Sequence, residues 1–282
     1  MRRIYLILAL LMTVGVTYAQ QKQLYVLHTS DTHSRIEPLE TNSSDRYRGT
    51  AGAARRSAYI NQMREQHPDL LLLDCGDIGQ GTPYYNMFKG ELEIEIMNQL
   101  GYDAMTIGNH EFDSGLENMA RLFRLAKFPI VCANYDFKGT VVDGLVKPYV
   151  VLKRDGLKIG IFGLSPELEG LVSKANCEGV AFKDPATTAN EMARLLRDKK
   201  KCDMVICLSH LGYDFGDTPE KYSDNVVFSQ THGIDLVLGG HSHTYMEKPV
   251  YLKDADGHTV TLFHTGKNGS FVGNYEITLN KK

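Results

Sequence analysis

Short, continuous apolar runs recur along this chain, and segments with helical periodicity separate them. The runs do not alternate with polar residues, which is typical of strands covered on both faces. Strands that alternate with helices predict an α/β sandwich whose inner strands are mostly parallel. The predicted strands are Leu24–Thr29, Leu70–Leu73, Ala104–Ile107, Ile130–Cys132, Leu157–Gly163, Met204–Leu208 and Leu236–Leu238. The predicted helices between them are Ala51–Glu65, Phe88–Leu100, Leu116–Ala126 and Ala186–Lys199.

The last part of the chain has a different pattern, with closely spaced strand-like segments and Asp-Gly and Asn-Gly turns. We predict antiparallel strands at Pro249–Tyr251, Val260–His264 and Gly273–Leu279. No linker rich in Pro, Gly or Ser divides the chain after residue 20, and no internal repeat is present. The sequence therefore predicts one domain over residues 20–282.

The N-terminus has the pattern of a secretory signal. Arg2 and Arg3 precede an apolar core, Ile4–Val16, and Ala19 offers a small residue for cleavage. We predict a signal peptide over residues 1–19 and hence an exported protein, periplasmic or extracellular; an uncleaved membrane anchor is the alternative. No later stretch approaches the roughly 18 apolar residues of a membrane span, so no stable membrane anchor is expected in the mature chain.

Charge and cysteine content limit the partners and the chemistry. The formal net charge is −3, which favours neither nucleic acid nor an anionic membrane as a partner. A phosphate-binding site would need its positive charge from local metal ions. The five cysteines are an odd number without a CxxC spacing, so a cysteine-based zinc site is not expected, and their pairing stays open.

Polar blocks follow the apolar runs at the points where the predicted strands end. They are Ser30–His33, Gly76-Asp77, Gly108–Asp113, Ser209-His210 and Gly240–His243. Side chains at the carboxyl ends of strands in such a sheet meet at one rim. The blocks place seven candidate metal ligands there, enough for two ions: Asp31, His33, Asp77, Asn109, His210, His241 and His243.

The spacing and type of these residues favour particular metals. In Asp31-x-His33 and His241-x-His243 the two side chains of each pair would share one side of an extended segment. Imidazole mixed with carboxylate suits zinc, manganese or iron rather than calcium. His28, inside the first predicted strand, is instead expected to be a structural histidine.

These blocks resemble those of the calcineurin-like metallophosphoesterases. In particular, they are similar to the catalytic domain of secreted 5′-nucleotidases and their UDP-sugar hydrolase and 2′,3′-cyclic phosphodiesterase relatives. The resemblance extends from about Leu24 to Leu279. It implies a four-layer αββα sandwich and a metal-dependent phosphoric ester hydrolase.

The resemblance also implies roles for the candidate residues. One divalent ion would be held by Asp31, His33, Asp77 and His243. The other would be held by Asp77, Asn109, His210 and His241, with Asp77 bridging. His110 and Asp113 match the catalytic pair of the family. Two segments depart from its usual pattern: Ser30 stands where an asparagine is usual, and His264-Thr265 stands where glutamine-alanine is common.

The expected reaction is hydrolysis of nucleoside 5′-monophosphates. Metal coordination lowers the pKa of water towards neutrality, and the resulting hydroxide can attack phosphorus. Alternative substrates are 2′,3′-cyclic nucleotides, UDP-sugars, pyrophosphates and other small phosphoesters; a non-catalytic subunit is the distant alternative. Family members carry a C-terminal nucleotide-recognition domain that this sequence lacks, so a separate chain is expected to supply it, or the specificity is loose.

Overall fold

The computed structural model describes residues 20–215 and 221–281. The predicted signal peptide, residues 1–19, lies outside the described residues, so it stays a prediction. Within the described ranges, none of the helices combines the length and the apolar character that crossing a membrane would require.

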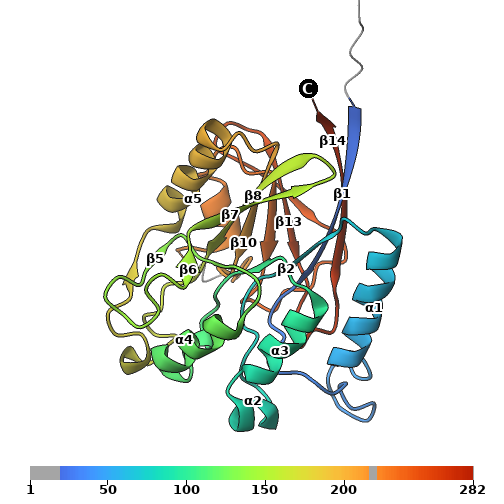
Figure 1. Ribbon diagram of the computed structural model, residues 1–282, viewed down its shortest axis with the longest axis vertical. Helices are drawn as coiled ribbons and strands as arrows, with labels where there is room; N and C mark the ends of the chain where they lie inside the picture. Colours follow the sequence, from blue (N-terminus) through green and yellow to red (C-terminus); the bar gives the residue numbers. More distant parts are fainter. Residues whose placement is uncertain (1–19, 216–220, 282) are drawn as a thin grey trace, which may run out of the picture.

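Two six-stranded sheets make up the centre of the fold (Figure 1). The first has the order β14-β1-β2-β3-β4-β6, and the second has the order β12-β13-β11-β10-β8-β7. The strands of the first sheet are β1 (Gln20–Thr29), β2 (Leu71–Asp74), β3 (Ala104–Met105), β4 (Ile130–Val131), β6 (Val146–Lys147) and β14 (Gly273–Lys281). Those of the second are β7 (Tyr149–Arg154), β8 (Leu157–Leu164), β10 (Met204–Ser209), β11 (Leu236–Gly239), β12 (Val250–Lys253) and β13 (Thr259–His264). A small ribbon pairs β5 (Tyr135–Asp136) with β9 (Ala181–Phe182).

Helices cover the outer faces of the two sheets. In Figure 1, α1, α3 and α4 lie beside the first sheet and α5 lies beside the second. The helices are α1 (Ala53–Gln66), α2 (Pro83–Phe88), α3 (Glu91–Leu100), α4 (Gly115–Leu125), α5 (Pro185–Arg194) and α6 (Asp224–Phe228). The structure also has two 3₁₀ turns, His110–Phe112 and Lys174–Asn176. A π-helical segment, Leu195–Lys199, extends α5.

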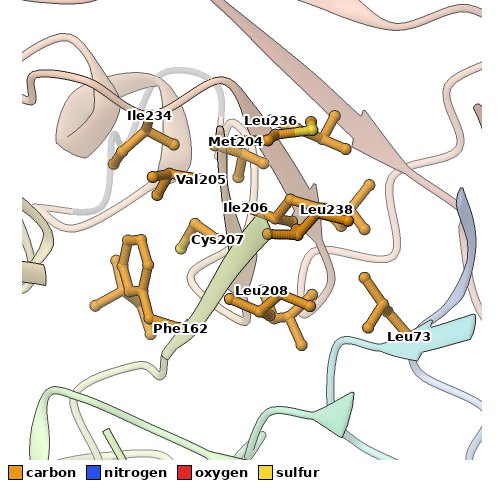
Figure 2. Close-up of a cluster of buried hydrophobic side chains, with 14 of the residues drawn as sticks. Leu73, Phe162, Met204, Val205, Ile206, Cys207, Leu208, Ile234, Leu236 and Leu238 are labelled. Atoms are coloured by element: carbon orange, nitrogen blue, oxygen red, sulfur yellow. The ribbon is translucent and has the colours of Figure 1, made fainter. Parts of the chain in front are cut away.

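The burial of β2 shows how the layers are arranged. Leu71 and Leu73 belong to the core that the first sheet shares with β10 and β11, and Figure 2 shows Leu73 in the same cluster as Leu208 and Leu238. Leu72, which points the opposite way, packs in the second core with Ile60 of α1. Because both faces of the strand are buried, its sequence is continuously apolar. The predicted α/β, four-layer αββα fold is confirmed.

Three details differ from the sequence predictions. The helix predicted over Phe88–Leu100 is broken, because Lys89 and Gly90 adopt left-handed backbone with φ of 53° and 94°. Glycine is favoured at position 90 because residues with a side chain rarely adopt a φ of 94°, and a Cβ there would also lie 2.7 Å from Leu122 Cδ1. The strands β3 and β4 are only two residues long.

The third difference concerns the C-terminal strands. They do not form one antiparallel group, because β13 pairs with β12 antiparallel but with β11 parallel. The last strand, β14, joins the other sheet and pairs antiparallel with β1. All five cysteines are free.

Candidate dinuclear metal centre

Parallel pairing brings the polar blocks to one end of both sheets. The strands β1 and β2 are parallel, with Thr29 opposite Asp74, and β10 and β11 are parallel, with Ser209 opposite Gly239. The blocks after these strands therefore leave from the same rim. A hydrogen bond joins the rims of the two sheets: the His241 backbone N–H donates to Asp31 Oδ1 at 3.0 Å.

The structure brings six of the seven predicted ligands into three overlapping groups. Within each group the potential ligand atoms lie within 4.8 Å of one another. The groups are Asp31, His33 and His243; His33, Asp77 and His110; and Asp77, His210 and His241. Asp77 and His33 each belong to two of the groups. Of these two residues, Asp77 has a pair of carboxylate oxygens, so it is the one that two ions could share.

Asn109, the seventh predicted ligand, is buried beside this cluster. The backbone N–H of the next residue, His110, donates to Asp77 Oδ1 at 2.9 Å. The Asn109 side-chain Oδ1 is buried and has no hydrogen-bond partner. A buried carbonyl oxygen without a partner is unfavourable, so this atom is suited to a ligand that the protein itself does not supply.

The backbone of the ligand loops is left-handed rather than extended. Asp31, His33, Asp77, His241 and His243 all have φ between 46° and 77°. The alternation expected for an extended Asp-x-His or His-x-His segment is therefore wrong. The Asp31 and His33 N–H groups instead donate to the carbonyls of Gly76 and Asp77, at 2.9 and 3.1 Å. Left-handed backbone costs energy for residues other than glycine, and such strain concentrates at functional sites.

Ring nitrogens of three of the candidate histidines face other candidate ligands. His210 Nδ1 lies 2.5 Å from the Cys75 carbonyl oxygen, which fixes the proton there and turns Nε2 towards Asp77 Oδ2 at 3.0 Å. His33 Nε2 and His243 Nε2 lie 2.9 Å apart. Imidazole nitrogens that converge on carboxylate oxygens fit divalent ions such as zinc, manganese or iron.

Burial favours the neutral form of two of the proposed histidine ligands. Burial lowers the pKa of His241 to about 3 and that of His243 to about 4. Both imidazoles are therefore neutral at pH 7, which is the form that coordinates metal. Burial raises the pKa of the Asp77 carboxyl, but the charge of His210 outweighs it and holds that pKa well below its usual range.

Comparison with known proteins identifies the family of this chain. The profile of the calcineurin-like phosphoesterases matches residues 24–245. The chain belongs to the calcineurin-like phosphoesterase family. It is 31% identical to bovine 5′-nucleotidase over 284 residues, an alignment that covers 94% of this chain and 48% of the relative.

Solved structures extend the comparison. A 5′-nucleotidase precursor from Thermus thermophilus superposes with a TM-score of 0.81 at 32% identity, covering 91% of this chain and 51% of that one. The NAD nucleotidase of Haemophilus influenzae has a TM-score of 0.80 at 28% identity, covering 92% and 48%. The chain spans about half the length of these relatives.

Sequence reasoning assigned no role to Glu111, whose carboxylate connects two loops of the candidate site. Its buried carboxylate accepts hydrogen bonds from the backbone N–H groups of Asp77 and Ile78, both at 2.9 Å, and of Gly108 at 2.5 Å. Glu111 thereby joins the Asp77 loop to the loop that carries Asn109. The only signal in the sequence was its place inside the Asn-His-Glu-Phe-Asp block.

Gly108 lets the backbone of its loop lie close to the side chain of Asp77. A Cβ at this position would lie 2.1 Å from Asp77 Oδ1. Any side chain here would displace the Asp77 carboxylate, so the loop requires glycine.

The predicted catalytic pair is formed at the edge of this centre. His110 Nδ1 lies 2.9 Å from Asp113 Oδ2, and both side chains are 30% exposed. Partial burial lowers the pKa of His110, but the hydrogen bond to Asp113 and the charge of Asp77 outweigh it and raise that pKa above its ordinary value. The pair can therefore hold a proton beside a bound phosphoryl group.

Proposed function

We propose that this phosphoesterase hydrolyses nucleoside 5′-monophosphates outside the cytoplasm, using two divalent metal ions. The observation that supports this best is the position of Asp77. Its carboxylate belongs both to the group with His33 and His110 and to the group with His210 and His241. One ion would be held by Asp31, His33, Asp77 and His243, and the other by Asp77, Asn109, His210 and His241.

Zinc or manganese, or alternatively iron, would fit this set of imidazole, carboxylate and amide donors. When bound, such ions activate water and offset negative charge on the phosphoryl oxygens. The surrounding residues hold the ligands in place. Glu111 fixes the Asp77 loop through the backbone, and the Cys75 carbonyl fixes the tautomer of His210.

His110 is the proposed proton donor to the leaving oxygen. Its Nδ1 faces Asp113, so Nε2 remains available for the phosphoester. A protonated imidazole at this point would stabilise the negative charge that develops as the ester bond breaks. Asp113 orients the ring and stabilises its charged form.

The nucleotide specificity is proposed from relatives that are named 5′-nucleotidase and NAD nucleotidase. The test is a panel of AMP, 2′,3′-cyclic AMP, UDP-glucose and 4-nitrophenyl phosphate, assayed with added manganese or zinc. We expect AMP to have the highest kcat/KM, with all activity lost in Asp77→Ala. Asp69→Ala is the matched control, because Asp69 is exposed and precedes the opposite end of β2. No hydrolysis with any metal, or full activity of Asp77→Ala, would contradict the proposal.

Two further parts of the proposal have separate tests. Export predicts that the mature chain begins near residue 20, which N-terminal sequencing of the protein from its host would show. A separate nucleotide-recognition chain predicts a co-purifying partner that raises turnover on AMP. Full and selective activity of this chain alone would contradict that second part.

A further inference from the structure

A cavity of about 400 Å³ lies between the first two turns of α1 and the segment that precedes β14. It is lined by Arg55, Arg56 and Tyr59 of α1 and by residues 49–51 and 269–272. The helix and the strand lie beside each other (Figure 1), and the Asn274 side-chain amide of β14 donates to the Tyr59 hydroxyl at 3.2 Å. None of the predicted metal ligands lines this cavity, so it is separate from the candidate centre.

The charged side chains that line the cavity are both cations. Arg55 is exposed, whereas Arg56 is only 8% exposed. Among the described residues, the lining includes neither aspartate nor glutamate. The helix α1 also begins without a hydrogen bond from a capping side chain, so the positive end of its dipole adds to the charge here. The electrostatics of the cavity therefore favour an anion.

Arg56 is the group in this cavity that most needs a partner. Its Nε and Nη1 atoms are buried and accept no hydrogen-bond partner from the protein. Across residues 20–215 and 221–281 no carboxylate lies within ion-pair distance of its guanidinium. A guanidinium keeps its charge at any physiological pH, so it cannot avoid the cost of burial by losing a proton.

Two buried carboxylates on the other side of Arg56 do not supply this partner. Asp74 and Glu93 line a second cavity with Arg56, of only about 10 Å³. The Asp74 carboxylate already accepts hydrogen bonds from the Thr29 hydroxyl at 2.5 Å and from the Gly76 N–H at 2.9 Å. A space of this size holds about one water molecule, so a larger anion can approach only from the first cavity.

The hydroxyl of Ser270 is a second group without a partner in the lining of the first cavity. Its Oγ is buried, and none of the described residues bonds to it. The neighbouring Gly269 lies close to the guanidinium, because a Cβ at this position would be 2.2 Å from Arg56 Nη1. A guanidinium and a hydroxyl that lack partners on one cavity are donors suited to the oxygens of an anion.

We infer that this cavity binds a small organic anion whose phosphate or carboxylate group pairs with Arg56. Arg55 and Ser270 would supply further donors, and Tyr59 and Phe271 offer aromatic surface to the rest of the ligand. The volume is in the range of small-molecule sites. The inference goes beyond the proposed function and does not depend on it, because the cavity contains no part of the metal centre.

Calorimetric titration of the metal-loaded protein with phenylphosphonate and with benzoate tests the inference. The two probes share a ring and differ in the anionic group, so the one that binds more tightly identifies that group. We expect the wild type to bind one equivalent more of this probe than Arg56→Met binds, whatever number the metal centre takes up. Arg55→Met should weaken binding at this site by about tenfold, the scale of a lost charge-assisted hydrogen bond.

Arg64→Met is the matched control, because Arg64 lies in the last turn of the same helix and does not line the cavity. It should bind both probes as the wild type does. Equal numbers of bound probe in the wild type and Arg56→Met would overturn the inference. If Arg56→Met does not fold, the exposed Arg55 decides the question, and an unchanged affinity in Arg55→Met overturns the inference. The proteins compared have the same metal centre, so neither result depends on nucleotide hydrolysis.

Discussion

The Nδ1 of His110 lies 2.9 Å from the Oδ2 of Asp113, within a single turn of chain that also carries Asn109. The hydrogen bond between them fixes which ring nitrogen remains available at the metal centre. It also raises the pKa of His110, against the opposing effect of burial. A proposed metal ligand and the proposed catalytic pair thus lie on one short segment.

His110→Ala should lower kcat for 4-nitrophenyl phosphate by about 10² to 10⁴, the usual contribution of a positioned proton donor. Asp113→Asn should lower it by about tenfold, because the ring keeps its position but loses the stabilising charge. Metal content, measured by mass spectrometry, should not change in either variant. Full activity of His110→Ala would exclude the assigned role.

Asp77→Asn should remove both metal ions, whereas Asp31→Asn should remove one. The reason is that Asp77 lies in two of the ligand groups and Asp31 in one. Metal content after dialysis against a weak chelator measures the difference. Equal losses in the two variants would show that Asp77 does not bridge.

Glu111→Gln should destabilise the fold and lower activity together. The carboxylate accepts three backbone N–H groups, and an amide in its place would turn a donor towards one of them. An unsatisfied buried group costs about 1–3 kcal/mol, measurable by urea unfolding. Glu117→Gln on α4 is the matched control, because Glu117 is exposed. Equal effects of the two substitutions would contradict the role of Glu111.

We expect the free energy of unfolding of the wild type to fall in mild acid because of His28. Burial lowers its pKa from 6.5 to about 3, so below pH 6.5 the unfolded chain binds a proton that the folded chain rejects. Stability contributed by the neutral ring is present above pH 6.5 and falls as the pH is lowered towards 3. Between pH 8 and pH 5 this group accounts for roughly 2 kcal/mol.

The variant His28→Leu checks this by urea unfolding at the two pH values. It should lose less stability than the wild type on acidification, because no proton can then be taken up at this position on unfolding. His258→Leu, a change at a side chain that is 78% exposed, should behave like the wild type. A wild-type pH dependence in His28→Leu would show that another group is responsible.

Much of the fold could be predicted because its signals are local. The continuous apolar runs identified the inner strands, and the polar blocks after them identified the metal-ligand candidates. His28, predicted to be a satisfied structural histidine, is fully buried against Phe263, but neither of its ring nitrogens has a hydrogen-bond partner within the described residues. Periodicity and side-chain chemistry are properties of neighbouring residues, so the sequence displays them directly.

The sequence by itself determined the type of fold, the seven candidate ligands and the class of reaction they suit. Only the tertiary structure decided that β14 pairs with β1 in the other sheet, and that the Asp31 and His33 backbone is left-handed rather than extended. It alone showed that the carboxylate of Glu111 accepts hydrogen bonds from the backbone of the Asp77 loop. These features depend on hydrogen bonds and packing between segments far apart in the chain, whose energies no local pattern contains.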